Sequence, residues 1–163
     1  MQYIEYETSS SQDNPEQLFY YVTGNSYTVS NEIHPEYYIG FRLKKHVFCI
    51  SSFSIISSYN PPNSWPHPKT WKILGSIDGK NWIVLNSHTN DNSLNDYGLF
   101  SHIETNKIVV RHLRFVSPTR FALYQLEFFG NLYPNSFMFP SPFVNYFHHL
   151  IPCFGLISAI NLV

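Results

Sequence analysis

The stretch that most constrains the fold runs from His67 to Leu85 and reads HPKTWKILGSIDGKNWIVL. Two segments within it, Thr70–Ser76 and Trp82–Asn86, carry tryptophan and branched apolar residues in strand-like order. Between them lies the dipeptide Asp78-Gly79, which supplies the positive φ that a tight hairpin turn needs. The sequence therefore predicts a β-hairpin.

The two faces of this hairpin differ in polarity. Trp71, Ile73 and Gly75 share one face because strand side chains alternate. Trp82 follows the turn closely, so we expect it to lie against the first strand, where a cross-strand aromatic pair helps to fix the register. A hairpin alone is marginally stable in water, so other strands must cover its apolar face.

The remaining sequence supplies those strands. At 163 residues, with 44% hydrophobic, 18% aromatic and 13% charged residues, the chain suits one all-β domain with large side chains between sheets. No segment has a convincing helical period, which favours a β-sandwich or barrel. The further strands are expected at Gln2–Glu7, Tyr37–Leu43, Val47–Ser57, Leu99–Ile103, Ile108–Val116 and Phe121–Gly130, with loops at 59–68 and 87–97.

The last part of the chain has a different composition. From Asn131 to Val163 there is no Lys, Arg, Asp or Glu. We therefore divide the chain into a domain at 1–131 and an apolar tail at 132–163, which we expect to be poorly ordered or loosely packed. Residues 143–163 are long enough to span a bilayer, but polar residues and Pro152 interrupt them, so a tail anchor is the alternative reading.

The expected compartment follows from the N-terminus and the cysteines. The first ten residues, MQYIEYETSS, have neither a basic flank nor an apolar run, so they do not form a secretory signal. Only Cys49 and Cys153 occur, in segments of different character, and a reducing compartment is the simpler explanation. We expect a cytoplasmic protein in which Cys49 is a buried thiol.

Three pieces of the sequence together resemble a known family. The central hairpin HPKTWKILGSIDGKNWIVL, the strand VVRHLRFV and the ending YQLEFFG resemble the F5/8 type C (discoidin) domain family, most closely the intracellular-type members with an HPK-x-W segment. The resemblance implies an all-β fold, an antiparallel jelly-roll β-sandwich of the galactose-binding-like type. It also implies a non-catalytic module that binds through the loops at one end.

The best candidate for ligand contact is Trp65, in the proline-rich loop. An indole beside the amide of Asn63 and the imidazole of His67 suits the face of a sugar ring or a partner peptide. Folding back to cap the end of the sandwich is the structural alternative for Trp65. Its companions are the loop residues that the fold would bring to the same end, Tyr27, Asn25 and Arg120.

Three charged residues stand among apolar strand residues, and we expect them to form an ion pair that closes the sandwich. Alternation places Arg111 on one face with Leu113 and Phe115. Glu127 is the expected partner of Arg111 and of the nearby Arg114.

Several functions are not supported. A net charge of −1 gives no electrostatic footprint for nucleic acid. No nucleophile elbow, P-loop or metalloprotease motif occurs, so we expect no enzyme and no cofactor. The histidines lack zinc spacing, and Asp91 and Asp96 are only weak calcium candidates. The expected partner is a glycan or a protein, and phospholipid docking at a membrane is the alternative.

Overall fold

The computed structural model describes residues 4–9, 27–28, 35–57, 67–95, 99–135 and 158–159, and for 27–28, 99, 101–107 and 158–159 the backbone alone. The regular elements in these ranges are β-strands, which confirms the all-β prediction. They are β1 (Ile4–Thr8), β2 (Tyr27–Thr28), β3 (Tyr37–Leu43), β4 (His46–Ser57), β5 (Trp71–Ser76), β6 (Trp82–His88), β7 (Leu99–Val110), β8 (His112–Ser117), β9 (Ala122–Pro134) and β10 (Ser158–Ala159).

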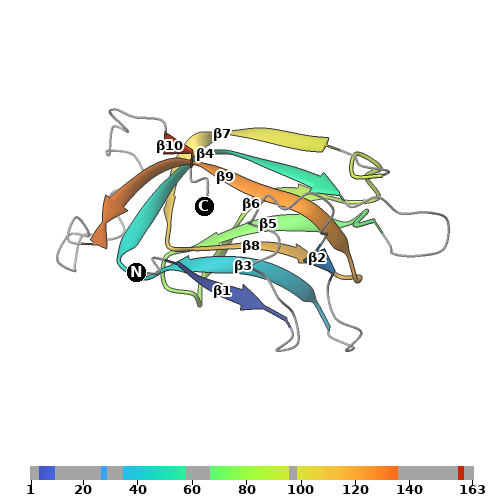
Figure 1. The fold of residues 1–163 in the computed structure, drawn as a ribbon, viewed down its shortest axis with the longest axis horizontal. Helices are drawn as coiled ribbons and strands as arrows, with labels where there is room; N and C mark the ends of the chain where they lie inside the picture. The colour runs from blue at the N-terminus through green and yellow to red at the C-terminus, as the bar shows by residue number, and fades with distance from the viewer. Residues whose placement is uncertain are drawn as a thin grey trace.

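The strands form two stacked sheets (Figure 1). The first sheet has the order β1-β3-β8-β5-β6, and the second has β10-β9-β4-β7, with β2 also paired to β9. Every described pairing is antiparallel. The chain crosses between the sheets, for example from β3 to β4 and from β8 to β9, so that strands distant in sequence become neighbours. The predicted antiparallel jelly-roll β-sandwich is confirmed.

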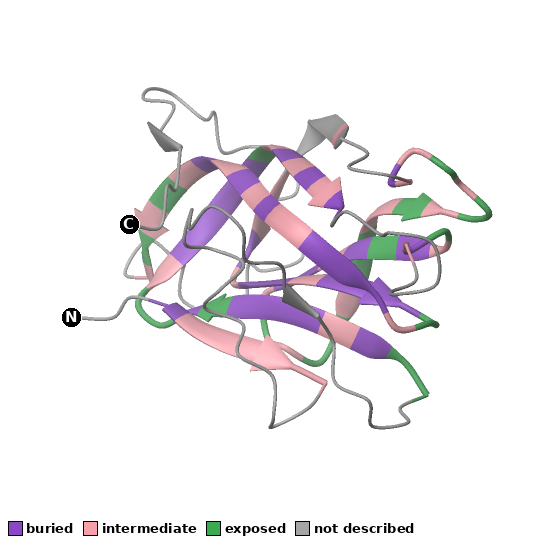
Figure 2. Cartoon of the chain, turned by 45° about the vertical axis from the view of Figure 1, so that its right-hand side comes forward, coloured by how far each residue is buried: buried purple, intermediate pink, exposed green. Residues whose placement is uncertain are grey.

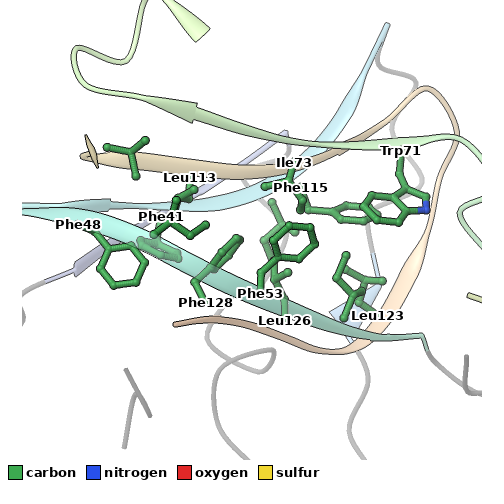
Figure 3. Packing of buried hydrophobic residues seen from close by; sticks show 14 of the residues in the cluster. Phe41, Phe48, Phe53, Trp71, Ile73, Leu113, Phe115, Leu123, Leu126 and Phe128 are labelled. Atoms are coloured by element: carbon green, nitrogen blue, oxygen red, sulfur yellow. The ribbon is translucent and has the colours of Figure 1, made fainter. Parts of the chain in front are cut away.

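Large aromatic and branched side chains fill the space between the sheets. In Figure 2 buried residues run through the strands of both layers, and Figure 3 shows how the rings lie. Trp71 of the first sheet is fully buried and meets Phe100 of the second edge to face, with ring centroids 5.0 Å apart. Phe41 and Phe128 make a second such contact across the layers at 5.5 Å. Removing a buried ring of this size typically costs about 3–5 kcal/mol.

The predicted hairpin is present as β5 and β6. Gly79 has a φ of 73°, and a Cβ there would also lie 2.9 Å from the His112 ring. Asp78 organises the turn, because its Oδ1 accepts hydrogen bonds from the backbone N–H groups of Lys80 and Asn81, each at 2.8 Å. These hydrogen bonds, that of Asn81 first, hold the pKa of Asp78 well below its ordinary value.

The expected aromatic pair across the hairpin is wrong. The turn sets Trp82 opposite Ser76, on the outer face of the sheet, whereas Trp71 lies opposite His88 on the inner face. Trp71 stacks on the His88 ring instead, with centroids 4.2 Å apart.

Strand boundaries also differ around Arg111. The sequence predicts separate strands at 99–103 and 108–116, but β7 runs on to Val110 in the second sheet and β8 begins at His112 in the first. The backbone of Arg111 already bonds to the first sheet: its N–H donates to Ser76 O of β5 at 2.8 Å, and its C=O accepts from Leu43 N of β3 at 3.0 Å. Because the chain changes sheets there, alternation does not carry from Arg111 to Leu113.

The outer face of the first sheet carries an ion pair, but with a different acid from the one expected. Arg114 Nε and Nη2 donate to Glu7 Oε2 at 3.0 and 2.9 Å, and His112 Nδ1 lies 3.0 Å from Glu7 Oε1. Gly40 lies between Glu7 and Arg114 in the sheet, and a Cβ there would be 2.8 Å from Arg114 Cγ. The missing side chain lets the carboxylate reach across β3.

The prediction that Glu127 pairs with Arg111 and Arg114 is therefore wrong for Arg114. Glu127 is in the second sheet, on β9, and its Oε2 accepts a hydrogen bond from Ser54 Oγ at 3.0 Å. Arg114 points away from that sheet, so no side-chain rotation brings the two groups together.

Cys49 is a buried thiol outside any disulfide, as expected. Cys153 and most of the tail lie outside the described residues. Within the tail the backbone of Ser158 and Ala159 pairs with Gly130 and Phe129 of β9. The part of the chain that the structure describes holds no helix long and apolar enough to cross a membrane.

The Glu7 network yields a test of stability. Glu7→Gln leaves the guanidinium of Arg114 with a neutral acceptor at a site where the Glu7 side chain is only 20% exposed. Hydrogen bonds to charged groups contribute about 1.5–3 kcal/mol, so we expect the melting temperature to fall by about 5 °C. Glu127→Gln is the matched control and should change it much less, since glutamine keeps an acceptor for Ser54. Equal losses in the two variants would contradict this account.

Candidate functional site

Three described connecting segments of the sandwich meet at one end. In the second sheet the end of β4 lies beside the start of β9, because Ser57 pairs with Leu123. In the first sheet the start of β5 lies beside the end of β8, because Lys72 pairs with Val116. The segments 67–70, 89–95 and 118–121 therefore lie at the same end, which we call the loop end. The opposite end carries the short turns 44–45 and 77–81.

The candidate ligand residues are distributed around this end as far as the structure describes them. His67 precedes β5, and Arg120 precedes β9. The backbone of Tyr27, in β2, pairs with Leu123 near the start of β9. Trp65, Asn63 and Asn25 lie outside the described residues. The predicted grouping of these side chains at one surface stays a prediction.

Asp91 ties two segments of the loop end together. Its backbone N–H donates to Lys69 O at 2.9 Å, and its carboxylate accepts from Ser93 N–H at 2.7 Å and contacts His88 Nδ1. The preceding residue, Asn90, adopts a φ of 53°, which turns the chain sharply after β6. Hydrogen bonds from Ser93, and then the contact with His88, lower the pKa of Asp91.

His88 connects this arrangement to the core. Its ring stacks on Trp71 and meets Phe100 edge to face at 4.5 Å. Trp71 in turn stacks on Phe115 at 5.6 Å. Leu94, after the turn, is fully buried in the core cluster. Residues 88–94 are thus anchored at both ends, and this part of the loop end is held in one conformation by the core.

The side chains at the loop end are mainly polar. Among the described residues of the loop end, Lys69, Asn90 and Asn92 are exposed, and Thr70 and Arg120 are half-buried. Ammonium, amide and hydroxyl groups are all hydrogen-bond donors, and the amides and hydroxyl also accept. Such a surface suits a ligand that is rich in hydroxyl groups.

Comparison with solved structures places the fold among known proteins. No family model matches the chain, and no curated protein matches it. Solved structures do: CBM32-6 produced by Clostridium perfringens has 19% sequence identity and a TM-score of 0.60, over 80% of this chain and 96% of that one. The family 32 carbohydrate-binding module of NanJ from the same organism, solved with galactose, has 11% identity and a TM-score of 0.58 over 77% and 92%.

A third structure, another Clostridium perfringens module of this kind solved with GalNAc-β-1,3-galactose, has 14% identity and a TM-score of 0.54, over 80% of this chain and 94% of that one. The chain has a discoidin-like β-sandwich fold. At these identities the likeness concerns the fold, and it confirms the fold that the sequence resemblance implies.

Sequence reasoning missed how this discoidin-like fold fixes its loop end. From the sequence alone, Asp91 is only a weak calcium candidate, and His88 does not stand out from the other histidines. The spacing H-x-x-D, followed by Ser93 two residues later, is a signal for a capped turn that would have found them.

The calcium prediction itself stays untested. Both carboxylate oxygens of Asp91 are engaged, one with Ser93 N–H and one with His88, and Asp96 lies outside the described residues. No group of three or more His, Cys, Asp or Glu side chains suited to a metal ion occurs within the described ranges.

The lowered pKa of Asp91 predicts an acid-sensitive contribution to stability. The carboxylate stabilises the folded protein above its ordinary pKa of 3.8, and this contribution is lost as the pH falls toward the lower folded-state value. Asp91→Ala should therefore cost about 1 kcal/mol at pH 7, after allowance for solvent screening. Thermal melts from pH 7 to pH 2.5 should show the difference from wild type narrowing below about pH 4.

Ser87→Ala, an exposed change on β6 near the same turn, serves as the control and should show a constant, small difference. A wild-type advantage over Asp91→Ala that stays level through pH 2.5 would refute the role assigned to the carboxylate.

Proposed function

We propose that this chain is a non-catalytic binding module that recognises carbohydrate through the loop end. The observation that carries the proposal is the fold shared with carbohydrate-binding modules over most of both chains. The arrangement of the chain adds support, because the two sheets bring the segments 67–70, 89–95 and 118–121 to the same end.

The composition of the loop end supports a neutral, hydroxyl-rich ligand. Sugar hydroxyls both donate and accept hydrogen bonds, as do the exposed amides of Asn90 and Asn92 and the hydroxyl of Thr70. In this proposal Trp65 supplies the apolar surface on which the face of a sugar ring lies, and Asn63, His67 and Arg120 supply further polar contacts.

Terminal galactose or N-acetylgalactosamine is the proposed sugar. Two proteins with this fold were solved with galactose and with GalNAc-β-1,3-galactose. Catalysis forms no part of the proposal, since the sequence carries no recognised catalytic motif and the three solved structures described above are named as carbohydrate-binding modules.

Titration with galactose and with N-acetylgalactosamine, followed by tryptophan fluorescence and calorimetry, tests the proposal. Wild type should bind one of them, and Trp65→Ala should weaken binding at least tenfold, which is about 1.4 kcal/mol. Lys80→Ala, in the turn 77–81 at the opposite end, is the control and should bind as wild type does.

A glycan array on which wild type gives no signal, together with unchanged fluorescence in both titrations, would overturn carbohydrate binding. Recovery of a partner protein that Trp65→Ala releases would then assign the loop end to protein recognition.

A further inference from the structure

The end of the sandwich opposite the loop end, which we call the turn end, is basic. Its connections are the turns 44–45 and 77–81 and the crossing at Arg111. Of the nine Lys and Arg side chains that the structure describes, five lie there: Arg42, Lys44, Lys45, Lys80 and Arg111. The described acids of this end are Glu5 and Asp78. Positive charge is therefore concentrated at the turn end, although the whole chain has a net charge of −1.

Backbone hydrogen bonds place the basic connections side by side. Arg111 N–H donates to Ser76 O at 2.8 Å, and Arg111 C=O accepts from Leu43 N–H at 3.0 Å. Strands bonded in this way lie about 4.8 Å apart. The turn that carries Lys45 follows Leu43, and the turn that carries Lys80 follows Ser76. Arg111 thus stands between two turns that each carry a lysine.

Most of this charge has no carboxylate partner. Glu5 is shared by two of the five cations, because its carboxylate contacts Arg42 and lies 3.3 Å from Lys44 Nζ. The basic residues of the turn end that form no ion pair within the described ranges are Lys45, Lys80 and Arg111.

Asp78, the second acid of the turn end, is occupied by its own turn. Its Oδ1 accepts from the backbone N–H groups of Lys80 and Asn81 at 2.8 Å each, and its Oδ2 accepts from Asn81 Nδ2 at 2.7 Å. The half-buried Arg111 has a buried Nε that makes no hydrogen bond. The basic side chains on either side of Ser76 are therefore left for a ligand to neutralise.

Exposed apolar side chains flank this basic surface. The large apolar residues that are exposed among the described ones are Ile83, Val84 and Leu132, at 42%, 56% and 38%. Ile83 and Val84 stand near the start of β6, directly after the hairpin turn. Leu132 pairs with Phe48 near the start of β4. A partner at the turn end therefore meets positive charge and apolar surface together.

The positions of the apolar groups favour a polypeptide over a membrane. Basic residues alone attract anionic lipid by about 1 kcal/mol each, and stable docking adds apolar groups that enter the bilayer. The tips of the turns read Lys-Lys at 44–45 and Asp-Gly-Lys-Asn at 78–81, so they offer no apolar wedge. The exposed apolar residues lie along strands instead, where a peptide that runs from turn to strand can reach them.

We propose that the turn end binds an acidic segment of a partner protein. Alternate side chains of an extended segment point the same way, about 6.6 Å apart, so carboxylates of one segment reach Lys45, Arg111 and Lys80 together. Arg111, in the middle, can hold a carboxylate by two parallel hydrogen bonds, which a lysine cannot do. An apolar residue beside the acidic run packs on Val84. This surface is separate from the loop end, so the proposal does not depend on carbohydrate binding.

Fluorescence anisotropy with a labelled hexaglutamate peptide tests the role of charge. Wild type should bind the peptide, and binding should weaken as salt rises from about 0.05 M to about 0.3 M. Lys45→Gln and Lys80→Gln should each weaken it about threefold, and the triple variant with Arg111→Gln at least about tenfold. Arg111→Lys should lose less than Arg111→Gln. Lys72→Gln, at an exposed lysine on β5 away from the turn end, is the control and should bind as wild type does.

A second peptide, with a leucine on each side of the six glutamates, tests the apolar contact. It should bind wild type about threefold more tightly than hexaglutamate, because a leucine side chain leaves water. Val84→Ser should remove this gain and leave the binding of hexaglutamate unchanged. Ser87→Ala, an exposed change further along β6, should keep the gain.

Melting curves must first show that each variant is folded. No binding of hexaglutamate by wild type at low salt, or equal binding by wild type and the triple variant, would overturn the proposal. Binding of wild type to phosphatidylserine vesicles but to neither peptide, lost in the triple variant, would also overturn it and assign the turn end to anionic lipid.

Discussion

Aromatic packing between the two sheets is the interaction on which the rest of this molecule depends. Trp71 and Phe41 from the first sheet meet Phe100 and Phe128 from the second. Neither sheet could bury its inner face alone. Trp71 has a second role, because the His88 ring stacks on it and carries the turn that follows β6. The geometry of the loop end is thereby set by the same contact that joins the layers.

The two ends of the sandwich are built differently. At the turn end, Asp78 and Gly79 close β5 onto β6 with short local hydrogen bonds. At the loop end, longer connections are secured by a few contacts such as those of Asp91, while exposed amides remain available to solvent. Residues placed on loops that a rigid scaffold positions are those that most often carry function.

Local sequence patterns predicted the features that depend on residues close together in the sequence. The hairpin, its turn and the burial of Trp71 followed from alternation and from one dipeptide. Contacts between strands that are far apart in the sequence could not be predicted from these patterns. Glu7 and Arg114 are 107 residues apart, and they meet only because β1, β3 and β8 are adjacent and Gly40 leaves room. Alternation also failed at Arg111, since a period of two assumes that the chain stays in one sheet.

In the candidate site, too, some features could be predicted from the sequence and others depend on contacts made only after folding. Its position at one end followed from the resemblance to discoidin domains, and His67, Arg120 and the backbone of Tyr27 lie there. The contacts that shape it, from Asp91 to His88 and Lys69, depend on how two connections cross after folding.

The central place of β8 has a consequence for how the chain folds. β8 lies between β3 and β5, so the β1–β3 pair and the β5–β6 hairpin form separate pieces until residues 112–117 insert between them. Such long-range closure is slow compared with hairpin formation. During synthesis on a ribosome, the first 111 residues hold two incomplete halves with unsatisfied inner strand edges. The edges of β3 and β5 therefore stay unpaired until β8 is in place.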